Sequence, residues 1–342
     1  MGRPGMPDVI IRCDASATLG LGHLTRAVAL AVALQREHGV SVELLITDEP
    51  SARAAIDAAT STAAVTVRRA PPADVDRVLA ESLESARALI LDHRGSLDDE
   101  IMSSARRRGQ LIATLDDPSP RRRLAQLAFY PPMPQVRRLD WNGFDGELYV
   151  GWEWVVLRHD LSAVRAPARR DVPRVLMTFG GSDPADVSSL AFDVMQRAPL
   201  QWAPRLVLGG ANPRAVELMT QGQARQLPVM HAPSDYATLM AESDIAVVAF
   251  GVSAYELAAC RIPALYVCLT ADHLESATAF EAEGLGRVIG LTEELTADTL
   301  SAHVRDALTA YADPMSWLHR VPASVDTLGA SRIVATIVDR LR

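Results

Sequence analysis

The residues with the clearest chemical potential lie near the start of the chain, in the run VIIRCDASATLGLGHLTRAVAL that begins at Val9. Its β-favouring start predicts a strand and its apolar end predicts a helix, so the small residues between them form a turn. Gly20 and Gly22 let the backbone bend there and let a ligand approach closely. His23 then lies at the helix start, where free amides and the helix dipole favour an anion. Arg26 follows at i+3 on roughly the same face.

A neutral His23 could remove a proton from an attacking hydroxyl or amine. A carboxylate beside the ring would orient it and support the imidazolium, and Asp14 and Asp92 are both candidates. The alternative is that the glycine turn only packs, with His23 as a surface or capping residue. Charges at the end of the same predicted strand favour the functional interpretation, because buried charges need partners. We therefore predict that His23 and Asp14 are catalytic and that the substrate is contacted by Arg12, Gly20, Gly22 and Arg26.

Charged residues also follow two later predicted strands of the first half. Asp92, His93 and Arg94 come after ALIL, and Asp116 and Asp117 come after LIATL. Apart from Asp116, we expect these residues to contact substrate, although aspartates after strands are commonly helix N-caps. The paired carboxylates Asp116 and Asp117 suggest a metal. No histidine spacing completes such a site, however, so neither a metal nor another cofactor is expected.

Arg94 needs an anionic partner, because a buried and unpaired guanidinium is costly. Asp98 or Asp99 nearby could form a simple ion pair with it. Alternatively, Arg94 could hold a phosphate or carboxylate of an acceptor through two parallel hydrogen bonds, helped by the run Arg121–Arg123.

The second half of the chain carries two small-residue loops after predicted strands, FGGSDP at 179–184 and AFGVSAYELAAC at 249–260. Amides of the second loop could cradle a diphosphate at a helix start. Glu256, one turn later, could accept hydrogen bonds from both ribose hydroxyls. Ordinary βα turns are the alternative. We expect nucleotide contacts from Phe250, Gly251, Val252, Ser253, Ala254, Glu256 and from His231, which follows the strand LPVM. We expect substrate contacts from Gly180, Gly181, Ser182, Asp272, His273 and Glu275.

Strand and helix signals alternate along both halves of the chain, and the motifs follow the strands. The strand signals fall at 9–13, 40–47, 64–70, 88–93, 110–117, 174–181, 204–210, 227–233, 245–251, 263–270 and 286–291. This alternation of strand and helix signals is lost from Phe129 to Trp154, where proline and aromatic residues cluster. Repeated βα units predict parallel sheets covered by helices on both faces. In such sheets ligands bind beyond the carboxyl ends of the strands, where the motifs lie.

The length of 342 residues and this repetition predict two domains. We expect a Rossmann-like domain at 1–160 with the base and the sugar or acceptor side, a linker at 161–173, and a second Rossmann-like domain at 174–325 that binds the nucleotide. A final amphipathic helix at 326–342 could cross back to the first domain. The predicted fold class is α/β, with two doubly wound domains facing a central cleft.

Composition excludes several classes of function. The net charge of −8 argues against nucleic-acid binding, which needs a basic surface. The chain contains no lysine, and its 34 strongly basic residues are all arginine. Lysine Schiff-base chemistry is therefore excluded. Three cysteines without a CxxC pair indicate reduced thiols and a cytoplasmic protein. The start Met1–Pro7 does not resemble a signal peptide, and no apolar run reaches the roughly 18 residues that span a bilayer, so no membrane insertion is expected.

The run IRCDASATLGLGHLTRAVALA resembles the UDP-2,4-diacetamido-2,4,6-trideoxy-beta-L-altropyranose hydrolase family of pseudaminic acid biosynthesis. That family shows a strand, then CDAS or SDSS, then IGxGH and Arg. The resemblance covers most of the chain and continues at Asp92–His93, Leu115–Asp117, the WVVLR of 154–158 and FGGSDP. The family looks like the GT-B glycosyltransferases. The resemblance implies that His23 is the base, that the loop before Glu256 holds the diphosphate, and that Glu256 binds the ribose.

Two departures from that family fall in the first half of the chain. Arg94 stands where the family usually has tyrosine, and FYPPMPQ at 129–135 stands in place of an LNQN-like segment. Both lie on the side expected to face the sugar or the acceptor. The family's fold and base therefore carry over more readily than its substrate.

Three functions are compatible with these residues. The first is an inverting glycosyltransferase that takes a nucleotide-diphosphate sugar as donor and a small polar acceptor, with His23 as base. The second is hydrolysis of the nucleotide sugar, with water in place of the acceptor. The third is a sensor of nucleotide sugars without catalysis, which the His23 and Arg26 motif disfavours. The replaced substrate-side residues favour transfer over hydrolysis.

Overall fold

The computed structural model describes residues 7–16, 20–50, 53–63, 65–158, 160–161, 170–197 and 202–342. The chain divides into two compact units. Unit 1 comprises Met1–His159 and Asp326–Arg342, and unit 2 comprises Asp160–Val325. Most of the predicted linker, residues 162–169, lies outside the described residues.

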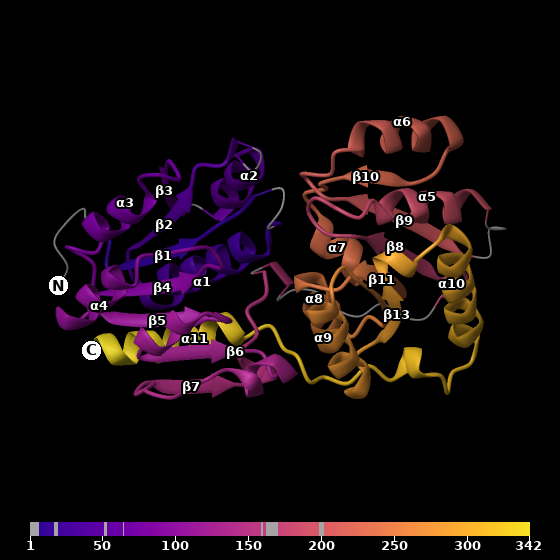
Figure 1. Cartoon of the computed structure of the whole chain (residues 1–342). Coiled ribbons are helices and arrows are strands. Elements are labelled where there is room, and N and C mark those ends of the chain that lie inside the picture. The colour runs from indigo at the N-terminus through magenta and orange to yellow at the C-terminus, as the bar shows by residue number, and fades with distance from the viewer. Residues whose placement is uncertain are drawn as a thin grey trace. The chain divides into compact units, whose positions relative to one another are not determined.

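Unit 1 is built on a seven-stranded parallel sheet in the order β3-β2-β1-β4-β5-β6-β7 (Figure 1). Alternate residues of β1 contribute to the two apolar cores on opposite faces of the sheet, because successive strand side chains point to opposite sides. The strands are β1 Val9–Cys13, β2 Val42–Thr47, β3 Thr66–Ala70, β4 Ala88–Asp92, β5 Leu111–Leu115, β6 Leu127–Tyr130 and β7 Glu147–Val150.

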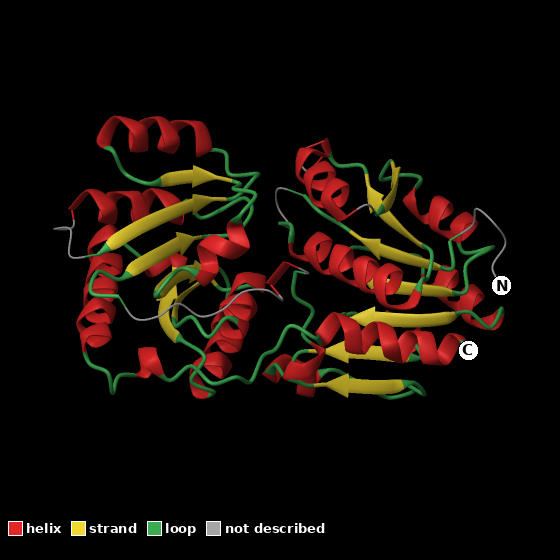
Figure 2. Ribbon diagram, turned by 180° about the vertical axis from the view of Figure 1, so that it is seen from behind, coloured by secondary structure: helices red, strands yellow, loops and turns green. Residues whose placement is uncertain are grey.

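Helices cover both faces of this sheet (Figure 2). Helix α1 is buried along most of its length, because it lies between the sheet and the C-terminal helix α11. Residues Ile333, Val334 and Ile337 of α11 belong to the same core as β1 and α1. The helices of unit 1 are α1 Gly22–His38, α2 Arg53–Ala63, α3 Val75–Ser82, α4 Asp99–Arg107 and α11 Gly329–Leu341, with short 3-10 turns η2 Pro120–Leu124, η3 Pro134–Arg138 and η4 Trp152–Trp154.

Unit 2 repeats the plan with a six-stranded parallel sheet in the order β10-β9-β8-β11-β12-β13. Its strands are β8 Arg174–Thr178, β9 Ala203–Leu208, β10 Val229–His231, β11 Ile245–Ala249, β12 Ala264–Cys268 and β13 Arg287–Leu291. Its helices are α5 Val187–Arg197, α6 Ala215–Arg225, α7 Tyr236–Ala241, α8 Val252–Ala259, α9 Ala271–Ala282 and α10 Ala297–Ala312, with 3-10 turns η6 Thr292–Glu294 and η7 Trp317–His319.

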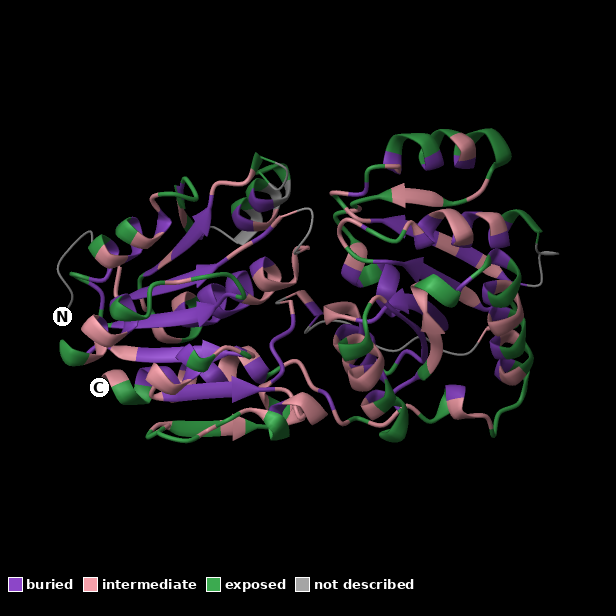
Figure 3. Cartoon of the chain, in the orientation of Figure 1, coloured by how far each residue is buried: buried purple, intermediate pink, exposed green. Residues whose placement is uncertain are grey.

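Each sheet reverses its direction of winding at one point, between β1 and β4 in unit 1 and between β8 and β11 in unit 2. Loops diverge there at the carboxyl ends of the two strands and leave room for a ligand. The central strands are buried in both sheets (Figure 3), so the side chains that follow them are held on a rigid base. The α/β class with two Rossmann-like doubly wound domains is confirmed.

Two strands were not predicted from the sequence. Strand β6 and strand β7 have four residues each and are joined through the turn η3 rather than through an α-helix. The alternation of strands and α-helices therefore ends at this edge of the sheet. Among the described residues, no helix is long and apolar enough to cross a membrane.

Candidate functional site

His23 meets a buried carboxylate at the switch point of unit 1. It is the second residue of α1, and its Nδ1 lies 2.6 Å from Oδ1 of Asp92, the last residue of β4. The side chain of Asp92 is fully buried, and that of His23 is 14% exposed. His23 is therefore neither a freely solvated nor a capping residue. Of the two candidate carboxylates, Asp92 is the one bonded to the His23 ring, whereas the prediction made Asp14 catalytic together with His23.

Arg26 holds the other side of the same carboxylate. Its Nε donates to Oδ2 of Asp92 at 2.9 Å and its Nη2 donates to Oδ1 at 2.6 Å. Burial alone raises the pKa of Asp92, but the charges of Arg26 and His23 and their hydrogen bonds outweigh it and lower that pKa to about 2. Asp92 is therefore an acceptor only, so Nδ1 of His23 carries the proton in their bond; this assignment is inferred from the partner. Nη2 of Arg26 lies 3.0 Å from the same Nδ1.

Asp14 is engaged in a second network beside the first. Its carboxylate accepts two hydrogen bonds from the Arg12 guanidinium, at 2.5 and 3.1 Å, and one from the backbone amide of Thr47 at 3.2 Å. Nδ1 of His93 lies 2.9 Å from its Oδ2. Burial raises the pKa of Asp14, but the hydrogen bonds from His93 and Arg12 lower it by a larger amount. The net pKa of Asp14 is therefore well below its usual range. Asp14 thus neutralises the buried Arg12 rather than orienting His23.

His93 is buried, with 4% of its side chain exposed. Its Nε2 lies 3.2 Å from the carbonyl oxygen of Ser96. The ring also packs against Gly95, where an added Cβ would lie 2.7 Å from the ring Cε1. The glycine is therefore required by a close approach, and the ring supports the loop after β4.

Asp117 is also buried, and its described hydrogen bonds are to groups of the protein itself. It accepts hydrogen bonds from the Ser119 amide and from Nε of Arg121, both at 2.8 Å. The rest of the Arg121 guanidinium donates to the carbonyl oxygens of His93 and Gly95, both at 2.7 Å. Arg121 therefore clamps the loop after β4 to the loop after β5. The sequence offered only the run of three arginines as a signal for this role.

Arg94 differs from these residues because it is 41% exposed. Its Nη2 donates to Oδ2 of Asp116 at 2.6 Å, so the partner is Asp116 rather than Asp98 or Asp99. Asp98 instead caps α4 by accepting from the Glu100 amide at 3.0 Å. Among the described residues, no group of three or more histidine, cysteine, aspartate or glutamate side chains is placed to hold a metal ion.

The loops at the switch point of unit 2 are made of small residues. Gly180 has a φ of +88°, and an added Cβ there would meet nothing within 4 Å. Gly209, after β9, packs against the same loop so closely that an added Cβ would lie 2.2 Å from the carbonyl oxygen of Gly180. The pair Gly209–Gly210 was not predicted as a site feature, although it repeats the Gly180–Gly181 pair at the next strand.

The loop after β11 leads directly into helix α8. Gly251 precedes the first helical residue, and an added Cβ there would also meet nothing within 4 Å. The Ser253 hydroxyl lies 3.4 Å from that of Tyr236. Glu256 is 3% exposed, and Ala254 is buried. Burial of the Cys260 thiol, with a further effect of the Glu256 charge, raises the pKa of Cys260 to about 12.

The remaining predicted residues of unit 2 are spread along the sheet. The Phe250 ring packs against Tyr266 and Phe280, with centroids 5.4 and 5.0 Å away, so only its backbone is offered to a ligand. His273 lies 6.2 Å from the same ring. Asp272 and Glu275 share helix α9 with His273. His231 ends the edge strand β10 and is separated from β11 by β9 and β8, so the structure does not bring it to Gly251.

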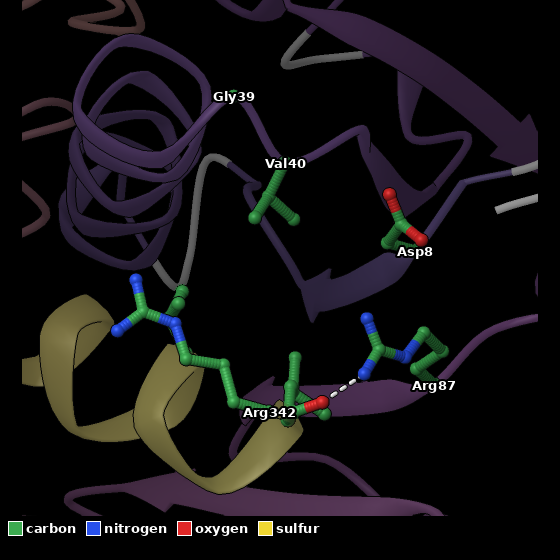
Figure 4. A pocket seen from close by; sticks show the side chains of 7 residues that line it. Asp8, Gly39, Val40, Arg87 and Arg342 are labelled. Atoms are coloured by element: carbon green, nitrogen blue, oxygen red, sulfur yellow. Dashed lines mark hydrogen bonds between the residues drawn. The ribbon is translucent and has the colours of Figure 1, made fainter. Parts of the chain in front are cut away.

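A small pocket lies in unit 1 at the amino ends of strands β1 and β4, opposite to the ends that carry His23 and Asp92 (Figure 4). There the Arg87 guanidinium donates to the backbone carbonyl of Leu341 in α11. The pocket is lined by Asp8, Gly39, Val40, Arg87, Val338, Leu341 and Arg342. It is thus separate from the His23 site, which lies at the carboxyl ends of the strands.

Two Rossmann-like units in one chain, with sheets of seven and six parallel strands, define a fold of the GT-B class. The S. aureus MnaA structure with UDP has a TM-score of 0.66 and 14% identity, and covers 98% of this chain and 97% of its own. CalG4, the calicheamicin glycosyltransferase, has a TM-score of 0.59 and 15% identity, with 98% of each chain covered. At these identities the likeness concerns the fold alone.

In sequence, the chain is similar to the spore coat polysaccharide biosynthesis protein SpsG of Bacillus subtilis (strain 168). The two are 26% identical over 202 residues, which is 56% of this chain. The matched region spans 58% of the length of SpsG. No family model matches the sequence.

Proposed function

We propose that this chain is an inverting glycosyltransferase that uses a nucleotide-diphosphate sugar, with UDP as the nucleotide, and a small polar acceptor. The observation that carries the proposal is the His23–Asp92 pair at the switch point of unit 1, at 2.6 Å. A histidine whose Nδ1 is bonded to a buried carboxylate presents Nε2 as a base. The similarity to SpsG and the GT-B fold support sugar-nucleotide chemistry.

In the proposed reaction, Nε2 of His23 takes the proton of the acceptor hydroxyl or amine as its oxygen or nitrogen attacks the anomeric carbon. The bond between that carbon and the diphosphate oxygen breaks, and the nucleotide diphosphate leaves with the electron pair. A single displacement inverts the anomeric centre. Asp92 stabilises the imidazolium that forms, and Arg26 keeps Asp92 ionised and in place.

Unit 2 is the proposed nucleotide side. The amides around Gly251, Val252 and Ser253 at the start of α8 would hold the diphosphate, because helix starts favour anions. Glu256, one helical turn further, would accept hydrogen bonds from the ribose hydroxyls. The open surface over Gly180 and Gly251 would let a ligand approach the backbone. A GT-B neighbour solved with UDP supports UDP as the nucleotide.

Hydrolysis is the second candidate, with water in place of the acceptor and the same base. It is favoured by the resemblance of the 11–31 run to the UDP-sugar hydrolase family, which continues at the pair Asp92–His93. Transfer is favoured by Arg94, an exposed guanidinium at a position where that family usually has a neutral phenol.

The experiment incubates the purified protein with a panel of nucleotide sugars and follows release of the nucleotide diphosphate, with and without small hydroxyl or amine acceptors. Transfer predicts release that needs an acceptor and a product of inverted configuration. Equal release without an acceptor supports the hydrolase instead. No release with any donor would contradict both candidates.

A further inference from the structure

Four arginines lie around the switch point of unit 1, and one differs from the others. Arg12, Arg26 and Arg121 are largely buried, and each donates several hydrogen bonds to carboxylates or carbonyls. Arg94 is 41% exposed and donates through one nitrogen only, to Asp116. A guanidinium has five N–H donors, so most of those of Arg94 have no partner among the described residues.

The partner of Arg94 has a second cation nearby. Oδ2 of Asp116 lies 2.6 Å from Arg94 and 3.8 Å from Nη1 of Arg26. The Asp116 backbone is fixed, because its amide donates to the carbonyl of Phe129 at 2.9 Å and its φ is +49°. If Arg94 turned away, the carboxylate would keep Arg26 as its counter-ion and would not be left unpaired.

We propose that Arg94 binds an oxyanion, a phosphate or a carboxylate, on the substrate group that unit 1 receives, and that Asp116 holds the guanidinium until this oxyanion displaces it. A phosphate or carboxylate can accept two parallel hydrogen bonds from arginine, whereas Asp116 accepts one. An exposed, single-bonded ion pair is weakly held, so displacement is inexpensive. If the bound group is the acceptor of the transfer reaction, this inference rests on the proposed function. It then states that the acceptor is anionic.

The anion site can be tested without turnover. The full-length protein, labelled with ¹⁵N-arginine, is titrated with methyl phosphate and with acetate, and the Nε–Hε signals are followed. The Arg94 signal is the one missing from Arg94→Gln. We expect a saturable shift of this signal and, in Arg94→Gln, at least about tenfold weaker binding of the anion. The comparison of methyl phosphate with acetate tells a phosphate site from a carboxylate site.

Two further variants sharpen the test. Asp116→Asn should bind the same anion at least as tightly as the wild type, because the competing carboxylate is gone while asparagine tolerates a positive φ. Arg107→Gln is the matched control, because Arg107 is also exposed and paired with one carboxylate, Glu100, in the same unit. It should bind as the wild type does.

The inference is overturned if neither anion shifts the Arg94 signal, if Arg94→Gln binds as well as the wild type, or if Asp116→Asn binds more weakly. With turnover in hand, Arg94→Gln should raise the KM of a charged acceptor at least about tenfold while the donor KM stays unchanged. Arg94-dependent anion binding in a protein that processes no nucleotide sugar would retain this site and reject the proposed function. Turnover with Arg94-independent binding would do the reverse.

Discussion

The carboxyl edges of the two sheets are built from the same topology but from different residues. In unit 1 the switch point carries buried charges, with Asp92 bound to His23 and Arg26, and Asp14 bound to Arg12. In unit 2 the corresponding loops carry glycines such as Gly180 and Gly251, over which there is open space.

The difference indicates two kinds of task. Proton transfer needs a base in a fixed tautomer, and a buried carboxylate with a guanidinium partner supplies that without further rearrangement. Recognition of a phosphate needs free backbone amides that a ligand can reach, and glycines before a helix supply those. If this division is correct, variants of unit 1 should change turnover and variants of unit 2 should change nucleotide affinity.

The largest effect is expected at the base. His23→Ala should lower kcat at least about 100-fold, because general base catalysis is removed. The matched control is His38→Ala, at the other end of the same helix α1. Steady-state rates of nucleotide-diphosphate release measure both variants. Unchanged turnover in His23→Ala would end the role assigned to this residue.

The next largest effect separates the two aspartates of unit 1. Asp92→Asn should lower kcat roughly 10- to 100-fold, because an amide can no longer stabilise the imidazolium and can favour the wrong tautomer. Asp14→Asn should lower kcat less and the melting temperature more, since Asp14 neutralises the buried Arg12. Kinetics and thermal unfolding on both variants check this order. A larger kcat loss in Asp14→Asn would restore the original assignment.

In unit 2, Glu256→Ala should weaken binding of the nucleotide diphosphate by roughly 1–3 kcal/mol, the scale of lost hydrogen bonds to a charged group. Its kcat at saturating donor should change little. Calorimetric titration gives the affinity, and Glu283→Ala, on an exposed residue at the end of α9, serves as the control. Equal affinity for Glu256→Ala and the wild type would remove Glu256 from the ribose.

The charges of unit 1 also predict a pH dependence of stability. The folded-state pKa of Asp92, about 2, lies below its ordinary value of 3.8. A lowered carboxyl pKa contributes stability that is complete above the unfolded value and is lost as the pH falls through the folded one. Asp92 should therefore contribute about 2 kcal/mol above roughly pH 4 and lose it towards pH 2.

Urea unfolding of the wild type and of Asp92→Asn across this acid range measures the contribution. The free energy of unfolding should fall less steeply with pH in the variant than in the wild type. Identical slopes would mean that the Asp92 carboxylate is not held by Arg26 and His23 in solution.

The smallest effect is expected from removal of metal ions. Excess EDTA should leave turnover within about twofold, because helix amides and arginine can carry the phosphate charge. A complete loss that Mg²⁺ restores would instead make Asp116 and Asp117 candidate ligands.

The sequence predicted eleven of the strands because each is a β-favouring run that ends at a turn and precedes a helical pattern. It missed β6 and β7 because no helix separates them. It placed Asp14 and Asp92 at strand ends and favoured Asp14 as the catalytic carboxylate, whereas Asp92 lies beside His23 in the structure. Their strands are neighbours, with Cys13 paired to Asp92, so both carboxylates arrive at the same edge. Which one meets His23 depends on side-chain packing between residues far apart in sequence. The Arg121 clamp depends on such packing as well.

The division between catalysis in unit 1 and nucleotide binding in unit 2 is tested most directly by the nucleotide-diphosphate affinity of His23→Ala. Calorimetric titration of UDP into this variant and into the wild type gives two dissociation constants under the same conditions. The account predicts that they agree within about twofold while turnover is lost, because a general base acts on the acceptor and not on the bound nucleotide. A dissociation constant that rises by the same factor as kcat falls would contradict it, because His23 would then be part of the nucleotide site.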